Sequence, residues 1–152
     1  MPISQTMCTS FKEEVLLGVH DFRSTGGDTF KLALYTSLAN LDANTASYTT
    51  AGEVVGVNYT AGGAVLTNDG VAASDGTGFA TFSNLTFANS TITARGALIY
   101  NSTPSANGAA NTPLTNPAVA ILDFGADKVS SNSSFTVSFP AATSTTAIIR
   151  IT

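Results

Sequence analysis

Apolar and polar residues alternate with a period of two in several stretches of the chain. Residues 30–35 place Phe30 and Leu32 on one side, and residues 134–139 place Phe135 and Val137 on one side. A period of two is typical of a β-strand that has one buried face. Both stretches are therefore predicted strands.

Further strands are predicted from short runs that are β-branched, aromatic or continuously apolar. Residues 118–124 are nearly all apolar, which indicates a strand in the middle of a sheet, and we expect Asp123 to end it and Gly125 to form a turn. The other predicted strands are 53–59 (with Gly56 as a candidate bulge), 64–67, 79–82, 91–100 and 146–151.

Three dipeptides between these runs are typical of tight turns: Asp69-Gly70, Asp75-Gly76 and Asn107-Gly108. Many short strands separated by such turns predict a mainly β fold, an antiparallel β-sandwich or barrel-like domain. We expect an extended N-terminal arm over residues 1–9 and a single β-rich domain over residues 10–152.

One stretch near the N-terminus has a helical pattern instead. Ser10 and Glu13 have the spacing of a capping box, and Gly26-Gly27 is expected to end the element. The predicted helix is amphipathic, with Leu16 beside a narrow apolar face. That face consists of Phe11, Val15, Val19 and Phe22.

Leu17 lies on the other side of this predicted helix, among acidic residues. It is either one exposed apolar residue or part of a contact with another chain. The first residues of the extended arm are a second candidate contact. The candidate partner-contact residues are therefore Met1, Pro2, Ile3 and Leu17.

Two long connections, 38–52 and 101–117, are rich in small polar residues and contain few bulky apolar ones. Loops of this length are uncommon in a small domain and usually carry contacts or stay mobile.

The composition excludes several classes of protein. Only 11 % of the 152 residues are charged, against about 25 % in an average soluble protein. Because 43 % are hydrophobic, the chain has enough apolar content for a core and is not expected to be disordered. No stretch is long and apolar enough for a membrane helix, and no secretory leader is recognisable.

The distribution of charge argues against a nucleic-acid partner. The formal net charge is −4, and no basic residue occurs between Lys31 and Arg95. A protein that binds nucleic acid needs a basic face to neutralise phosphates. Strands with so few lysines also lack the usual protection of exposed sheet edges, so we expect much of this surface to meet protein.

The chain offers few groups for catalysis or metal binding. His20 is the only histidine and Cys8 the only cysteine. We expect His20 to be a surface or helix-capping residue and Cys8 to be a free, inert thiol. We therefore predict no catalytic residues, no cofactor and no metal site.

Carboxylates give no better candidate. Asp69 and Asp75 have no calcium-loop spacing and are expected in tight turns. A small β-domain enzyme or a lectin remains an alternative. An enzyme would have to rely on carboxylates such as Asp123 and Asp127, whose spacing favours no known hydrolytic geometry.

Several longer strings are more distinctive than their composition. They are SFKEEVLLGVHDF (10–22), KLALYTSLANLDANTASYT (31–49), NYTAGGAVL (58–66), STITARGALIYNST (90–103) and NPAVAILDFGADK (116–128). In order and spacing they resemble a family of small virion structural proteins of tailed bacteriophages, notably phages of aquatic bacteria and cyanobacteria. The resemblance runs from about residue 10 to residue 152.

This resemblance implies a non-enzymatic role in the particle. The leading expectation is a capsid decoration (cement) protein that stabilises the head, binds the major capsid protein and forms homo-oligomers, with a trimer favoured. It would be made in the host cytoplasm and reside on the capsid surface. The alternative is a tail, neck or fibre-associated virion protein that contacts host surface glycans. No site residue can be carried over, because no family site motif is matched.

Overall fold

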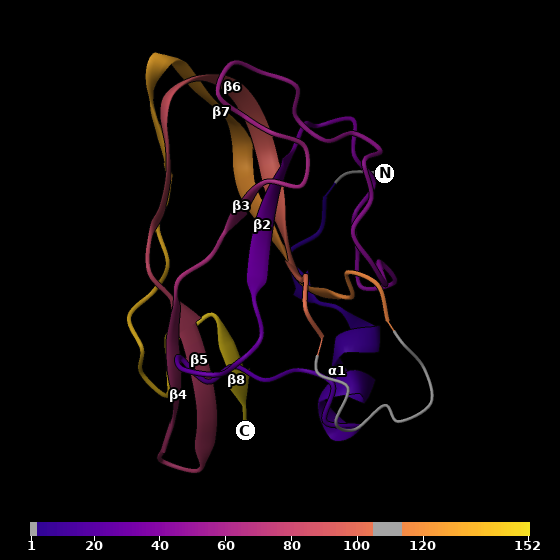
Figure 1. Ribbon diagram of the computed structural model, residues 1–152, viewed down its shortest axis with the longest axis vertical. Coiled ribbons are helices and arrows are strands. Elements are labelled where there is room, and N and C mark those ends of the chain that lie inside the picture. Colours follow the sequence, from indigo (N-terminus) through magenta and orange to yellow (C-terminus); the bar gives the residue numbers. More distant parts are fainter. Residues whose placement is uncertain (1–2, 105–113) are drawn as a thin grey trace.

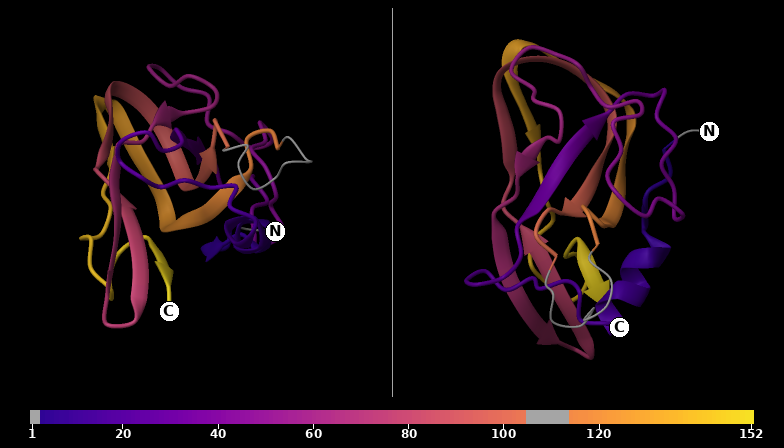
Figure 2. Two further views of the ribbon diagram at one scale, coloured as in Figure 1. Left: turned by 60° about the horizontal axis from the view of Figure 1, so that its bottom comes forward. Right: turned by 45° about the vertical axis from the view of Figure 1, so that its right-hand side comes forward.

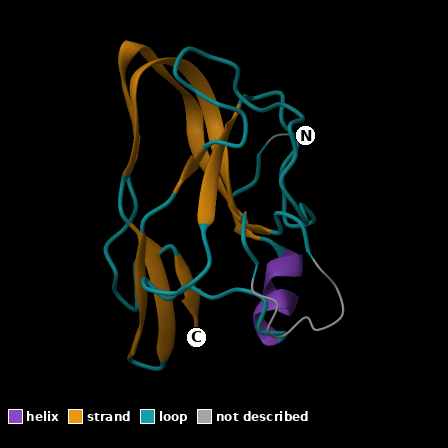
Figure 3. Ribbon diagram, viewed as in Figure 1, coloured by secondary structure: helices purple, strands orange, loops and turns teal. Residues whose placement is uncertain are grey.

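The computed structural model describes residues 3–104 and 114–152. The fold is mainly β, with antiparallel sheets and one short N-terminal helix, as predicted (Figure 3). Its elements in chain order are β1 (Thr6–Met7), α1 (Thr9–Leu16), β2 (Phe30–Tyr35), β3 (Ala64–Val65), β4 (Asn68–Ser74), β5 (Thr77–Phe82), β6 (Leu85–Asn101), β7 (Ala118–Val137) and β8 (Ile149–Ile151).

The described strands form two antiparallel sheets. The larger has the order β1-β7-β6-β2-β3, and the smaller has the order β4-β5-β8. Two further views show the smaller sheet near one end of the molecule, with α1 at the same end (Figure 2). The long pair β6–β7 forms the centre of the larger sheet.

The β6–β7 ribbon is bent over on itself. It rises through the centre of the molecule, curves over the top and descends along the left side in Figure 1. The register shifts several times along the pair, and Asn89, Gly125 and Asn132 have positive φ angles of 49°, 79° and 49°. Such bulges bend a strand and increase its twist, which lets two long strands turn a corner.

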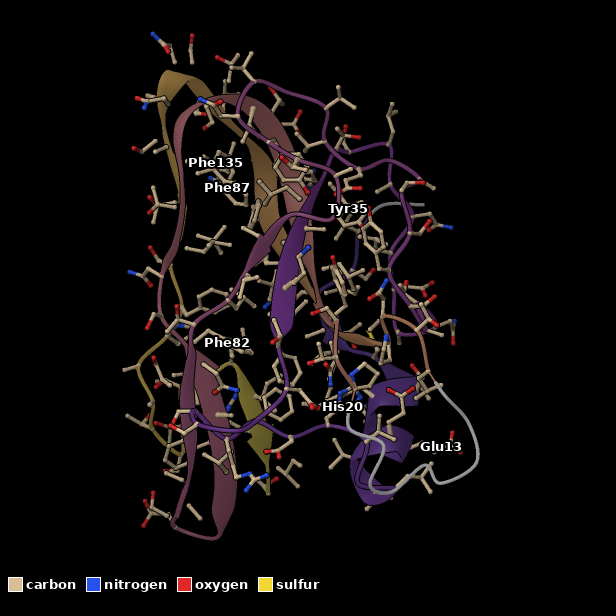
Figure 4. The ribbon with its side chains drawn as sticks, viewed as in Figure 1. Glu13, His20, Tyr35, Phe82, Phe87 and Phe135 are labelled. Atoms are coloured by element: carbon tan, nitrogen blue, oxygen red, sulfur yellow. The ribbon has the colours of Figure 1, made fainter. Side chains whose placement is uncertain are left out.

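The bend produces a sandwich-like core. Phe87 and Phe135, from the descending half of the ribbon, lie between that half and the central strands (Figure 4). Both are 7 % exposed, whereas Leu98 and Ile121 of the rising half are completely buried. The apolar faces of the two halves are thus removed from water together, which is the main stabilising contribution to such a fold.

The Asp75-Gly76 turn is confirmed. It joins β4 to β5, with Ser74 opposite Thr77 and φ angles of 50° and 75° at the two turn residues. The expected turn at Asp69-Gly70 is wrong, because these residues lie within β4, where the register shifts. Asn107-Gly108 lies outside the described residues.

The helix is shorter than predicted. It ends at Leu16 because Gly18 takes a φ of 74°, with its N–H donating to the carbonyl of Val15 and the Val19 N–H donating to that of Glu14. This pair of bonds is the Schellman motif. No side chain caps the start, and the Ser10 hydroxyl has no partner, so the capping box is wrong.

The predicted apolar face is confirmed, since Phe11 and Val19 are buried and Val15 and Phe22 pack against the core, but Leu16 and Glu14 differ from the prediction. Phe11 and Glu14 are buried, while Leu16 is 89 % exposed. Aromatic rings then connect the helix to both sheets. Phe11 of α1 lies 5.9 Å from Phe22 between ring centroids, Phe22 lies 4.3 Å from Phe30, and Phe30 lies 5.8 Å from Phe82. The N-terminal element is thereby fixed to the core.

Two strand assignments need correction. Residues 53–59 form only isolated bridges, Tyr35 with Glu53 and Val57 with Thr91, so the predicted strand is absent from this segment. Residues 118–124 and 134–139 do not form separate strands, because β7 runs continuously from Ala118 to Val137. Asp123 therefore does not end a strand, and Gly125 forms a bend within one.

The described part of the N-terminal arm, residues 3–9, lies against its own domain. Thr6 and Met7 pair with Ile121 and Ala120 of β7, and Ile3 is only 3 % exposed. A Cβ at Gly96 would lie 2.9 Å from Cδ1 of Ile3, so the glycine makes room for that side chain.

Candidate functional site

His20, the only histidine, is a buried residue and not the surface residue that the sequence suggested. Its side chain is 0 % exposed, although its backbone reaches the surface. Nε2 lies 2.8 Å from Oε1 of Glu14, and Nδ1 lies 3.1 Å from the amide nitrogen of Asn101. The Asn101 amide also donates to the carboxylate of Asp28.

This environment assigns the proton of His20 to Nε2, because that nitrogen faces a carboxylate while Nδ1 faces an N–H donor. Burial lowers the pKa of His20, and the hydrogen bond that its ring donates to Glu14 opposes this shift only in part. Both ring nitrogens are occupied within the core, so neither is placed to take a proton from a bound substrate.

Cys8 has the environment of an inert thiol, as expected. It is completely buried, and its pKa is raised to about 12, first by burial and then by the charges of Glu14 and Asp42. The thiolate is the nucleophilic form, and this site strongly disfavours it.

The carboxylates proposed from the sequence do not form a catalytic pair. Asp123 accepts a hydrogen bond from the Arg95 side chain at 2.9 Å and another from the Gly125 N–H, and this arginine is the main cause of its lowered pKa. Asp127 is exposed. Asp69 and Asp75 accept hydrogen bonds from the Ser83 and Ser144 hydroxyls.

Within 3–104 and 114–152, no three histidine, cysteine or acidic side chains are grouped so that they could hold a metal ion. No helix in the same ranges is long and apolar enough to cross a membrane.

The most connected polar cluster surrounds Glu53 and was not anticipated from the sequence. One carboxylate oxygen accepts from the Tyr48 hydroxyl at 2.6 Å. The other accepts from the Tyr59 hydroxyl and the Gly62 N–H, each at 2.7 Å. A half-buried carboxylate with three such donors is well satisfied without a cation.

The other two tyrosines of the chain extend the cluster. The Tyr35 hydroxyl donates to the carbonyl of Thr49, and the Tyr100 hydroxyl donates to that of Gly62, both at 2.6 Å. The rings of Tyr48 and Tyr100 stack with centroids 4.9 Å apart. Residues from β2, β6 and the 48–62 loop are thereby tied together.

Burial, aided by the negative charge of Glu53, raises the pKa of all four tyrosines. For Tyr100 the pKa rises to about 12, and for Tyr35, Tyr48 and Tyr59 it rises further. The hydroxyls therefore stay protonated as donors throughout the physiological range, and the cluster stabilises the fold.

The cluster anchors a segment that covers the outer side of β2. Val54 donates its N–H to Leu34 and is 4 % exposed, whereas Val55 and Val57 project outward and are 99 % and 61 % exposed. Val65 of β3, on the same side of β2, is 56 % exposed. We call this surface, carrying Val55, Val57 and Val65, the valine edge.

The opposite edge of the larger sheet is hollowed. A cavity of about 560 Å³ lies along β7 and the residues after it, with Gln5 and Ile148 at its sides. Its lining includes the aromatic residues Phe124, Phe135 and Phe139. We call this cavity the β7 groove. Its volume is in the range of about 300–1,000 Å³ typical of ligand pockets.

The β7 groove follows the backbone of the strand. Its lining includes every residue from Ser134 to Pro140. Side chains of an extended chain alternate between two faces, so a cavity that touches seven consecutive residues must lie along the strand edge. The described residues supply no strand neighbour there, because β1 pairs only with Ala120 and Ile121.

The candidate partner-contact residues fall in different environments. Met1 and Pro2 lie outside the described residues. Ile3 is buried in its own core, which leaves little of it for a partner to touch. Leu17 is 50 % exposed at the end of α1, next to the more exposed Leu16.

Neither the tyrosine cluster nor the β7 groove had a readable signal in the sequence. Both depend on contacts between residues far apart in the chain, such as Tyr100 with Gly62.

Comparison with protein-family models, curated proteins and solved structures gives no match to this chain.

Proposed function

We propose that this chain is a non-enzymatic structural protein of a bacteriophage particle, and that it decorates and stabilises the capsid shell. The phage assignment rests on the resemblance of five strings of its sequence to small virion proteins. The assembly role has independent support from the architecture.

The observation that best supports an assembly role is the apolar surface that remains exposed at both edges of the larger sheet. One edge bears projecting valines, and the other is an apolar groove along unpaired backbone. Monomeric proteins normally protect such edges with charge or with covering segments. Surfaces that combine apolar residues with little charge are typical of protein contacts.

Leu16 and Leu17 offer a separate apolar contact at the end of α1. They are 89 % and 50 % exposed and adjacent in the chain. We propose that this pair contacts the major capsid protein, since both side chains are apolar and exposed and α1 lies at the lower right of the molecule (Figure 1).

The copy number of the chain in purified phage particles tests the proposal. A decoration protein covers the shell, so quantitative gel analysis of virions should give hundreds of copies per particle. A count of about 5, 6 or 12, as expected from the symmetry of tails and portals, would contradict the decoration role.

Binding to the shell gives a second test. Purified chain should bind expanded shells that lack it and raise the temperature at which they break open, because a ligand of the assembled state stabilises that state. Unexpanded shells of the same capsid protein serve as the matched control and should bind less.

A tail, neck or fibre-associated protein that contacts host glycans is the second candidate. The aromatic rings and the polar rim of the β7 groove, which includes Gln5 and Asp123, favour it, because sugars bind through ring stacking and hydrogen bonds. Labelled protein should then bind host cells in competition with host polysaccharide. Absence of competition would remove this candidate.

A further inference from the structure

The backbone edge of the β7 groove can accept an extended segment of another chain. Ser134–Val137 lies on a strand whose outer side has no strand neighbour among the described residues. The same strand edge already accepts an extended segment nearer its start, where Thr6 and Met7 pair with it. Addition of a strand to an open edge is a recurring mode of recognition, with pockets for alternate side chains.

The floor of the groove suits apolar side chains. Leu122, Phe124, Phe139 and Ile148 are each half-buried, so part of each remains in water in the isolated chain. Covering these surfaces contributes about 25 cal/mol per Å² of apolar area.

Charge at the groove offers little opposition to such a contact. Asp123 is already paired with Arg95. Lys128 is exposed and can keep its ammonium group in water while its stem lies over apolar surface. An apolar segment therefore docks without the desolvation of an unpaired charge.

The chain itself carries a segment of the required kind. Residues 53–57 alternate like a strand, with Val54 inward and Val55 and Val57 outward, yet they form only isolated bridges in the described fold. Glu53 and its tyrosine donors hold this segment in place, so little ordering is needed when it binds.

We propose that copies of this chain associate head to tail, with the valine edge of one copy seated in the β7 groove of the next. The two surfaces lie on opposite edges of the same sheet, so each copy offers one of each. Such a heterologous contact closes into a ring when the rotation between copies permits and otherwise extends as a filament. The contact is a property of the isolated chain and does not depend on the phage assignment.

Sedimentation velocity of the isolated chain over a dilution series tests the proposal. The wild type should form species larger than a monomer at high concentration. Val55→Glu on the valine edge and Val129→Glu in the groove should each weaken association at least about tenfold. Both residues are largely exposed, at 99 % and 68 %, so circular dichroism should show intact folds.

Val71→Glu is the matched control. Val71 is 60 % exposed on β4, away from both surfaces, so this variant should associate like the wild type. Equal weakening by Val71→Glu would show a general effect of added charge and would overturn the assignment of the contact.

Mixing the two weakened variants gives the sharpest test. Val55→Glu retains its groove, and Val129→Glu retains its valine edge. Together they should form a two-chain complex of wild-type affinity that cannot grow further. A wild type that stays monomeric at every concentration, or a mixture that stays monomeric, would overturn the proposal. If Val129→Glu alone abolishes association, another segment occupies the groove, and the proposed occupant is wrong.

Discussion

The two edges of the larger sheet differ in how far the chain itself covers them. On one, the segment over β2 is held by a carboxylate and four tyrosines, whose hydrogen bonds are satisfied within the chain. On the other, β1 covers only two residues of β7, and an apolar groove of about 560 Å³ continues beyond them. The first edge is held by internal hydrogen bonds and projects valines, whereas the second leaves Ser134–Val137 without a strand neighbour among the described residues.

The comparison teaches that the placement of polar groups decides which edge of this sheet is stabilised within the chain. In the tyrosine cluster, the donors and acceptors form hydrogen bonds with groups of the same chain. The groove leaves backbone groups and half-buried apolar surface exposed.

Deleting residues 1–8 should destabilise the fold by about 4 kcal/mol or more, because it removes the buried side chains of Ile3 and Cys8 together with β1. Urea unfolding measures the change. Ser4→Ala, at an exposed position of the same segment, should have no comparable effect. A deleted protein as stable as the wild type would show that β1 does not complete the β7 edge.

Glu53→Ala should cost about 3 kcal/mol, because it leaves the Tyr48 and Tyr59 hydroxyls and the Gly62 N–H without their acceptor. Asp127→Ala, which removes an exposed carboxylate from β7, is the matched control and should change stability by less than about 0.5 kcal/mol. Equal losses of stability in Glu53→Ala and Asp127→Ala would mean that the Glu53 carboxylate stabilises the fold no more than an exposed carboxylate does.

Alkaline pH should act on the tyrosine cluster and on the buried Cys8 thiol, whose pKa is also raised. The tyrosine pKa values are raised in the fold, so the native state retains protons that the unfolded chain loses, and stability falls as the pH rises above about 10. Tyrosinate absorbance and the loss of β-sheet circular dichroism should appear together in one transition. Tyrosinate formation well before unfolding would contradict the buried environment.

Phe124→Ala should cost only about 1 kcal/mol, less than a fully buried phenylalanine, because Phe124 is half-buried on the floor of the groove. Association between copies of the Phe124→Ala variant should nevertheless be weaker than in the wild type, as measured by sedimentation velocity. Loss of stability as large as that of Glu53→Ala would show that the groove is an integral part of the core.

Leu17→Asp should have the smallest effect on the fold, within about 0.5 kcal/mol, since Leu17 is 50 % exposed. We expect it to reduce binding to capsid shells and to leave association between copies unchanged. Lys12→Asp, on the same helix, is the control for added negative charge near α1. Unchanged shell binding would show that Leu17 is merely exposed.

The sequence predicted the fold class well because alternation is a local signal. Residues 30–35 became β2, and the Asp75-Gly76 turn became a hairpin. Local sequence patterns predicted the wrong structure where contacts with residues far along the chain decide whether a strand forms. The β-branched run 53–59 is bridged and not a strand, since Gly56 packs so closely on the Thr91 backbone that a Cβ would collide with it.

The environments of the candidate residues were harder to predict for the same reason. His20 is buried because Glu14, six residues earlier, and Asn101, far along the chain, satisfy its two ring nitrogens. Gly125 was expected in a turn, but its positive φ serves a bend inside a continuous strand. No pattern of nearby residues distinguishes these outcomes.

Hydrogen–deuterium exchange tests the central claim, that the two edges of this sheet meet protein in the assembled particle. Exchange would be compared between the dilute isolated chain and the chain within purified phage particles. We predict that amides of residues 55–57 and 134–138 become strongly protected in the particle, while those of the β4–β5 hairpin change little. Equal exchange of both edges in the two states would contradict the account.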